Sequence, residues 1–169
     1  MRVLDLFSGC GGMSLGFQNA GFEVIAAYDS WNAAVETYNH NFDHECFQSD
    51  LGNLNSYGSL TRFQPDMIIG GPPCQDFSSA GKRDENLGRA DLTISFAEIV
   101  IAVMPKWFVM ENVERIKKSK ILTTIKEMLT SAGYGLTETV INASYCKVPQ
   151  ARKRFFLIGR LGEKSNFIN

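Results

Sequence analysis

The feature that most constrains this sequence is a regular alternation of short apolar, strand-like runs with helix-like segments. Strands are predicted, in chain order, over residues 3–7, 23–28, 45–48, 66–69, 106–113, 135–142 and 154–158. Helices are predicted over residues 13–19, 32–40, 92–103 and 121–131. Strands that alternate with helices favour an α/β fold, in which a mostly parallel sheet carries helices on both of its faces.

Length and composition are those of one globular domain. The 169 residues are 44% hydrophobic and 21% charged, which argues against a disordered or fibrous chain. No apolar run reaches the roughly 20 residues of a membrane span and no signal peptide is visible, so we predict a cytoplasmic protein. The four cysteines lack metal-type spacing, which favours free thiols and predicts no metal site. A net charge of −1 gives no overall nucleic-acid signal.

The stretch "GGPPCQDFSSAG", residues 70–81, follows a predicted strand and contains a cysteine. Pro72 and Pro73 cannot continue a central strand, because proline fixes φ and lacks an N–H donor. The chain should therefore stop and present Cys74 on a shaped loop, at the edge where open α/β sheets bind ligands. A lone cysteine is more often a small buried hydrophobe than a nucleophile. The polar residues 76–91 that follow are a candidate mobile, functional loop.

A glycine cluster lies where the first strand turns into the first helix, in "DLFSGCGGMSLG". Bare backbone at Gly9 and Gly11 allows a ligand to approach the free N–H groups of a helix N-terminus. The dinucleotide fingerprint GxGxxG fails, because its third glycine is replaced by Ser14. A nucleotide-dependent oxidoreductase is therefore disfavoured.

Three side chains after the second and third strands complete a candidate adenosine pocket. Asp29 is placed to accept from ribose hydroxyls, Trp31 to stack on an adenine, and Asp50 to accept from an exocyclic amine. The structural alternative is a tight turn, a helix cap and a core tryptophan.

Two further groups of side chains suggest chemistry. Glu111 ends an apolar strand, where a carboxylate is costly unless it is paired, functional or used as a helix cap. Arg152 and Arg154 alternate, so in extended backbone both point to one face, which suits phosphates or an anionic intermediate. The alternative for the two arginines is a solvated strand edge.

These motifs together resemble the cytosine-5 DNA methyltransferases, from Asp5 to Gly159. "FSGCGG" is similar to the family's cofactor loop, "GPPCQDFS" to its catalytic loop, "ENV" to its acid motif and "QARKR" to its QxRxR motif. The resemblance implies a Rossmann-like methyltransferase fold, S-adenosylmethionine as the cofactor and double-stranded DNA as the substrate. A catalytically silent binding module and a methyltransferase acting on RNA remain alternatives.

The resemblance also implies roles for individual residues. Cys74 would attack C6 of a flipped cytosine, Glu111 would protonate N3 or donate a hydrogen bond to it, and Arg152 would orient the base. Arg154 would support the loop or a phosphate. The implied cofactor contacts are Phe7, Ser8, Gly9, Gly11, Gly12, Asp29, Ser30, Trp31, Asp50, Leu51 and Pro72.

The sequence departs from the family pattern in two places. Asp29 stands where members commonly carry glutamate, so the ribose would be reached by a shorter arm. No target-recognition region or last motif follows residue 162, which predicts a catalytic domain over residues 1–162 and the start of a recognition region over 163–169. A catalytic half that needs a separately encoded recognition chain, a truncation and a degenerate remnant are the alternatives.

Overall fold

The computed structural model describes residues 1–53, 57–73 and 92–168. Its strands are β1 (Arg2–Leu6), β2 (Glu23–Asp29), β3 (Cys46–Gln48), β4 (Met67–Gly70), β5 (Trp107–Val113), β6 (Tyr134–Asn142) and β7 (Lys153–Leu161). Its α-helices are α1 (Gly12–Asn19), α2 (Asn32–Asn41), α3 (Tyr57–Leu60), α4 (Leu92–Val103) and α5 (Lys120–Ser131). Single turns of 3-10 helix are η2 (Thr61–Phe63), η4 (Glu114–Lys118) and η5 (Ala143–Cys146).

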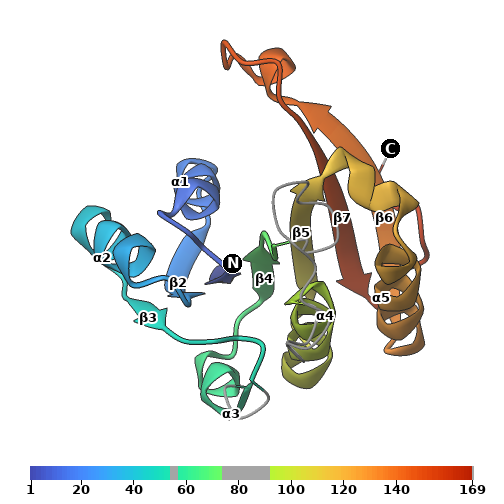
Figure 1. Ribbon diagram of the computed structural model, residues 1–169. Coiled ribbons are helices and arrows are strands. Elements are labelled where there is room, and N and C mark those ends of the chain that lie inside the picture. The colour runs from blue at the N-terminus through green and yellow to red at the C-terminus, as the bar shows by residue number, and fades with distance from the viewer. Residues whose placement is uncertain (54–56, 74–91, 169) are drawn as a thin grey trace, which may run out of the picture.

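All the strands join one sheet, in the order β3-β2-β1-β4-β5-β7-β6 (Figure 1). The pairs within β3-β2-β1-β4-β5 are parallel. β7 is antiparallel to both of its neighbours, β5 and β6. The predicted α/β fold with a mostly parallel sheet is confirmed.

Side chains that alternate along the strands build a separate core on each face of the sheet. On one face, Val3, Met67 and Ile69 pack with Met13 and Phe17 of α1. On the other face, the buried side chains of β1, β4 and β5 join those of α4 and α5 in the main cluster: Leu4, Leu6, Ile68, Phe96, Ile99, Phe108, Ile125 and Leu129. Helices therefore cover both faces, as the alternating pattern predicts (Figure 1).

The predicted elements agree with the observed ones to within three residues at each end, and α4 has the predicted bounds. The pattern did not reveal α3 or the 3-10 turns η2, η4 and η5, because a single turn is too short to show helical periodicity. The whole of the predicted polar loop, residues 76–91, lies outside the described residues, and so does Cys74.

The segment after β7 turns back along the edge of β6. The backbone N–H of Asn166 donates to the Leu136 carbonyl at 2.8 Å, and the Phe167 ring lies 5.7 Å from the ring of Trp107. Residues 163–168 therefore pack on the same sheet as the strands before them. Across the described residues, no helix is both long and apolar enough to cross a membrane.

Candidate active site

The candidate site lies along the edge of the sheet where the parallel strands end. β1, β2, β4 and β5 all run towards this edge, so the residues that follow them are neighbours in space. β7 is antiparallel to β5 and therefore starts at the same edge, with Arg154 opposite Val113. The topology thus brings the predicted cofactor loop, proline loop, acid motif and arginine motif together.

The loop after β1 is an unusual run of left-handed backbone. Phe7, Gly9 and Gly11 have φ angles of 57°, 54° and 94°. At Gly11 an added Cβ would lie 2.3 Å from the Phe42 ring, so glycine is required there by both backbone and space. At Gly9 and Gly12 an added Cβ would meet no atom within 4 Å, which leaves bare backbone facing open space.

Asp29 ties this loop to the end of β2. Its Oδ2 accepts from the Gly9 N–H at 2.8 Å, and its Oδ1 accepts from the Trp31 N–H at 2.9 Å. The sequence predicts a ribose acceptor at Asp29. In the structure both carboxylate oxygens hold backbone, and each retains a lone pair for a further donor.

The other predicted cofactor residues lie at the same edge, in different environments. The side chain of Trp31 is 70% exposed, which suits a stacking surface, whereas Leu51 is buried in the main core. Asp50 accepts from the Gly52 N–H at 2.9 Å, and the Ser30 carbonyl accepts from Gln48 at 3.3 Å. The Ser8 side chain is buried and lies 3.5 Å from the sulfur of Cys46.

Glu111 and Arg154 form an ion pair where β5 ends. The Nε of Arg154 lies 2.8 Å from Oε1 of Glu111, and both side chains are largely buried. Burial raises the pKa of Glu111 above its ordinary value, against the opposing effect of the Arg154 and Arg152 charges. The effect of burial on the pKa is larger than that of the two arginine charges, because the carboxylate is desolvated. This acid therefore holds its proton to a higher pH than an exposed glutamate.

The proline loop is fixed beside this acid. Asn112 donates from its side chain to the Pro72 carbonyl at 3.0 Å, and its Oδ1 accepts from the Val113 N–H at 2.8 Å. An added Cβ at Gly71 would lie 3.2 Å from Oε2 of Glu111. The chain therefore passes directly over the carboxylate just before Cys74, which lies outside the described residues.

Arg152 lies just before β7. Its backbone N–H donates to the side-chain oxygen of Asn142 at 3.0 Å, and its carbonyl accepts from the Ala143 N–H at 2.9 Å. The guanidinium is exposed, while that of Arg154 is paired with Glu111. The sequence predicts that both arginines point to one face. In the structure the positive charges of Arg154 and Arg152 both lower the pKa of Glu111.

Sequence reasoning missed a buried hydrogen-bonded chain behind the glycine loop. Ser14 of α1 donates to Oδ2 of Asp5 at 2.6 Å, and Tyr38 of α2 donates to the Ser14 hydroxyl at 2.7 Å. Nε2 of His44 lies 2.6 Å from the Tyr38 hydroxyl. Oδ1 of Asp5 has no partner among the described residues. The visible signal was a carboxylate inside the apolar run of β1.

Burial raises the pKa of Asp5 from 3.8 to about 7. Between these two values the folded chain binds a proton that the unfolded chain has lost, so the contribution of Asp5 to stability falls as pH rises. Above pH 7 the raised pKa of Asp5 lowers the free energy of unfolding by about 4 kcal/mol, at about 1.36 kcal/mol per pKa unit. We expect Asp5→Asn to gain stability relative to wild type as pH rises from about 4 to about 7.

Urea unfolding at several pH values measures this difference. Asp66→Asn, at an exposed carboxylate on the opposite edge of the sheet, provides the comparison for the same chemical change outside the core. A pH-independent difference between Asp5→Asn and wild type would contradict the assignment.

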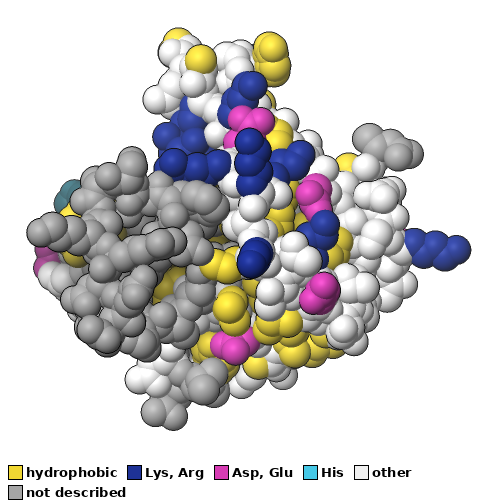
Figure 2. All heavy atoms as spheres, turned by 45° about the vertical axis from the view of Figure 1, so that its right-hand side comes forward, with side chains coloured by type: hydrophobic (Ala, Val, Ile, Leu, Met, Phe, Trp, Pro, Cys, Tyr) yellow, Lys and Arg dark blue, Asp and Glu magenta, His cyan; other side chains and the backbone are white. Residues whose placement is uncertain are grey.

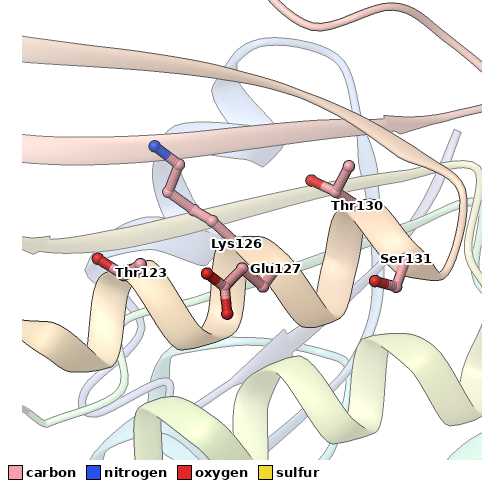
Figure 3. Close-up of a pocket in the computed structure, with 5 residues that line it drawn as sticks. All are labelled: Thr123, Lys126, Glu127, Thr130 and Ser131. Carbon is pink, nitrogen blue, oxygen red and sulfur yellow. The ribbon is translucent and has the colours of Figure 1, made fainter.

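The structure also has a hollow of about 420 Å³ on the surface of α5, lined by Thr123, Lys126, Glu127, Thr130 and Ser131 (Figure 3). Lys126 forms an ion pair with Glu138 of β6. The lining contains none of the predicted site residues, so this hollow is separate from the candidate active site.

The family model described as C-5 cytosine-specific DNA methylase matches residues 1–169. The Type II methyltransferase M.HindV of Haemophilus influenzae is 57% identical over 99% of this chain and 56% of its own length. M.HgiDI of Herpetosiphon aurantiacus, also a Type II methyltransferase, is 56% identical over 94% of this chain and 52% of its own length. The chain therefore spans about half the length of these curated relatives.

A solved structure supports the fold. The S. pombe Dnmt2 methyltransferase superposes with a TM-score of 0.81 at 24% identity, over 99% of this chain and 51% of that one.

Proposed function

This chain belongs to the C-5 cytosine-specific DNA methylase family, and from that premise we propose that it methylates C5 of cytosine in double-stranded DNA. One observation carries the proposal. The Glu111–Arg154 pair lies directly against the Gly71–Pro72 turn that leads into Cys74. The chain that leads to the proposed nucleophile therefore passes the proposed proton donor at one edge of the sheet, next to a glycine loop that is open to a ligand.

The residues at the end of β1 and β2 fit S-adenosylmethionine. Three kinds of group lie at this edge of the sheet: the bare backbone of Gly9 and Gly12, the carboxylate of Asp29 and the exposed ring of Trp31. We propose that these groups hold the cofactor, with Asp29 on the ribose and Trp31 on the adenine. When bound, the cofactor supplies an electrophilic methyl group on a cationic sulfur.

Cytosine C5 is a weak nucleophile, so the ring must be activated before it accepts a methyl group. In the proposed reaction the Cys74 thiolate attacks C6 while Glu111 gives a proton, or a hydrogen bond, to N3. C5 would then take the methyl group that the cofactor supplies, as the bond from that methyl group to sulfur breaks. The C5 proton would pass to a base, and the thiolate would leave as the C5–C6 double bond re-forms and N3 gives up its proton. Arg152 orients the base and favours the thiolate, and Arg154 holds Glu111 in position.

The target base must leave the double helix for this chemistry, because C6 is not accessible to a thiolate within a stacked duplex. The relatives are about twice as long as the part of them that this chain matches. We propose that target recognition depends on such additional polypeptide, in the same chain or in a second one. The domain boundary at residue 162 stays a prediction.

The direct test is methyl transfer from labelled S-adenosylmethionine to duplex DNA, followed by digestion to nucleosides. We expect label in 5-methyldeoxycytidine. Parallel reactions with RNA address the alternative substrate, and label in RNA alone would overturn the assignment to DNA. Bound cofactor and bound DNA without transfer would show that these 169 residues are not a complete enzyme.

A further inference from the structure

We propose that a basic surface formed by η4, the residue after η5 and the start of β7 binds the phosphodiester backbone of duplex DNA beside the target cytosine. This surface, called here the η4–β7 surface, consists of Arg115, Lys117 and Lys118 of η4, Lys147 directly after η5, and Lys153 at the start of β7. The inference rests on the proposed function, and it assigns the phosphate contacts to side chains that have no role in the proposed reaction.

Charge is strongly polarised along a chain whose net charge is only −1. Residues 114–120 and 147–154 hold eight of the 17 Lys and Arg residues but one of the 18 Asp and Glu residues. The remaining sequence carries nine basic and 17 acidic residues. Net charge therefore hides a concentrated positive region, which attracts polyanions locally.

The fold brings the two basic segments together. η4 continues directly from the end of β5, and β7 pairs with β5 so that Arg154 lies opposite Val113. Ile116 is fully buried and anchors η4, which leaves its three basic side chains exposed. Figure 2 shows Lys and Arg side chains gathered on the upper part of this face.

A hollow of about 480 Å³ lies between the segments. Glu114 of η4 and Lys153 of β7 both line it, together with Tyr145, whose side chain is 88% exposed. Within residues 1–53, 57–73 and 92–168, the ion pairs involve none of Lys117, Lys118, Lys147 and Lys153. Among the described residues, these ammonium groups therefore have no carboxylate partner.

The position and chemistry of the surface favour DNA phosphates over base edges. η4 begins three residues after Glu111, so the surface borders the pocket proposed for the flipped base. A base that leaves the stack stays attached to its own backbone, whose phosphates must lie at the mouth of the pocket. Lysine is a mobile point charge that suits phosphate, whereas base readout favours arginine or amide side chains in a groove. The contacts should therefore be independent of DNA sequence.

The test is the salt dependence of duplex binding by the double variant Lys117→Gln/Lys118→Gln. Each phosphate contact contributes about −0.9 to the slope of log K against log salt concentration. We expect the slope to become shallower by about 1.8, with equal weakening on duplexes of different sequence. Fluorescence anisotropy between 50 and 200 mM salt measures this, on the full 169-residue chain.

The matched control is Lys106→Gln/Lys164→Gln, which removes two exposed charges at the opposite edge of the sheet. Its slope should equal that of wild type. The inference is overturned if the salt slope of Lys117→Gln/Lys118→Gln equals that of wild type, or if the slope of the control variant falls by the same amount. It is also overturned if wild type does not bind duplex DNA at 50 mM salt. A shallower slope of Lys117→Gln/Lys118→Gln with single-stranded RNA, but not with duplex DNA, also overturns the inference.

Methyl transfer, measured in parallel at low salt, separates this inference from the proposed function. Transfer by wild type with an unchanged slope in the variant defeats only the assignment of the surface. A reduced slope without methyl transfer by wild type supports the surface and defeats the activity of the chain.

Discussion

Replacement of Cys74 by serine is expected to abolish methyl transfer while cofactor binding stays close to that of wild type. A serine hydroxyl is not ionised near neutral pH and is a far poorer nucleophile than a thiolate, so C6 would not be attacked. Loss of a catalytic nucleophile lowers turnover by roughly 10³- to 10⁶-fold. Cofactor titration and a methyl-transfer assay on the same preparation measure the two properties separately.

Cys146 provides the matched control, because it is an exposed free thiol in η5, close in sequence to the arginine motif. Cys146→Ser should retain full transfer. Turnover by Cys74→Ser would remove the thiolate from the proposed reaction.

A covalent trap tests the same atom more directly. Duplex DNA with 5-fluorocytosine, incubated with the chain and S-adenosylmethionine, should give an adduct that survives a denaturing gel, because fluorine cannot leave C5 as a proton does. The adduct should form with Cys146→Ser and not with Cys74→Ser. Absence of an adduct with wild type, although cofactor is bound, would place the missing requirement in a recognition region or a second chain.

Most strands and helices of the fold could be predicted, because the residue pattern of each element lies within a short stretch of sequence. The apolar run Val3–Leu6 and the helical spacing of Leu92–Val103 are visible in short windows, and both elements formed where predicted. Position within the sheet is different, since it depends on pairings between distant segments. No local pattern shows that β7 lies between β5 and β6, yet this insertion alone places Arg154 on Glu111.

The same distinction applies to the site. Motif spacing singled out Glu111, Arg152 and the glycine loop as candidates, because each lies at or beside the end of a recognisable strand. The partners of these residues were not predictable, because a side chain's hydrogen bonds depend on contacts made in three dimensions. Asp29 was predicted as a ribose acceptor, and the structure adds that it holds the Gly9 and Trp31 backbone. The contact from Asn112 to Pro72 likewise depends on β4 and β5 being neighbours.

Glu111→Gln is expected to lower kcat by about 10²- to 10⁴-fold, the range typical of a lost general acid. Glutamine keeps the size of the side chain and a hydrogen-bond donor, but it cannot release a proton to N3. Glu23→Gln, at an exposed position where β2 begins and at the opposite edge of the sheet, is the control and should leave kcat unchanged. A Glu111→Gln enzyme with normal kcat would show that N3 is activated by another group.

The pH profile then distinguishes a proton donor from a merely structural glutamate. Because burial raises the pKa of Glu111, the donor form persists above the usual range, and kcat should fall as pH rises through that pKa. Arg154 lowers the same pKa through its charge, so Arg154→Gln should move the falling limb to higher pH as well as reducing the maximum. The limb should be absent in Glu111→Gln, which has no carboxyl to titrate. A limb that stays in place in both variants would assign it to a different residue and leave Glu111 a structural partner of Arg154.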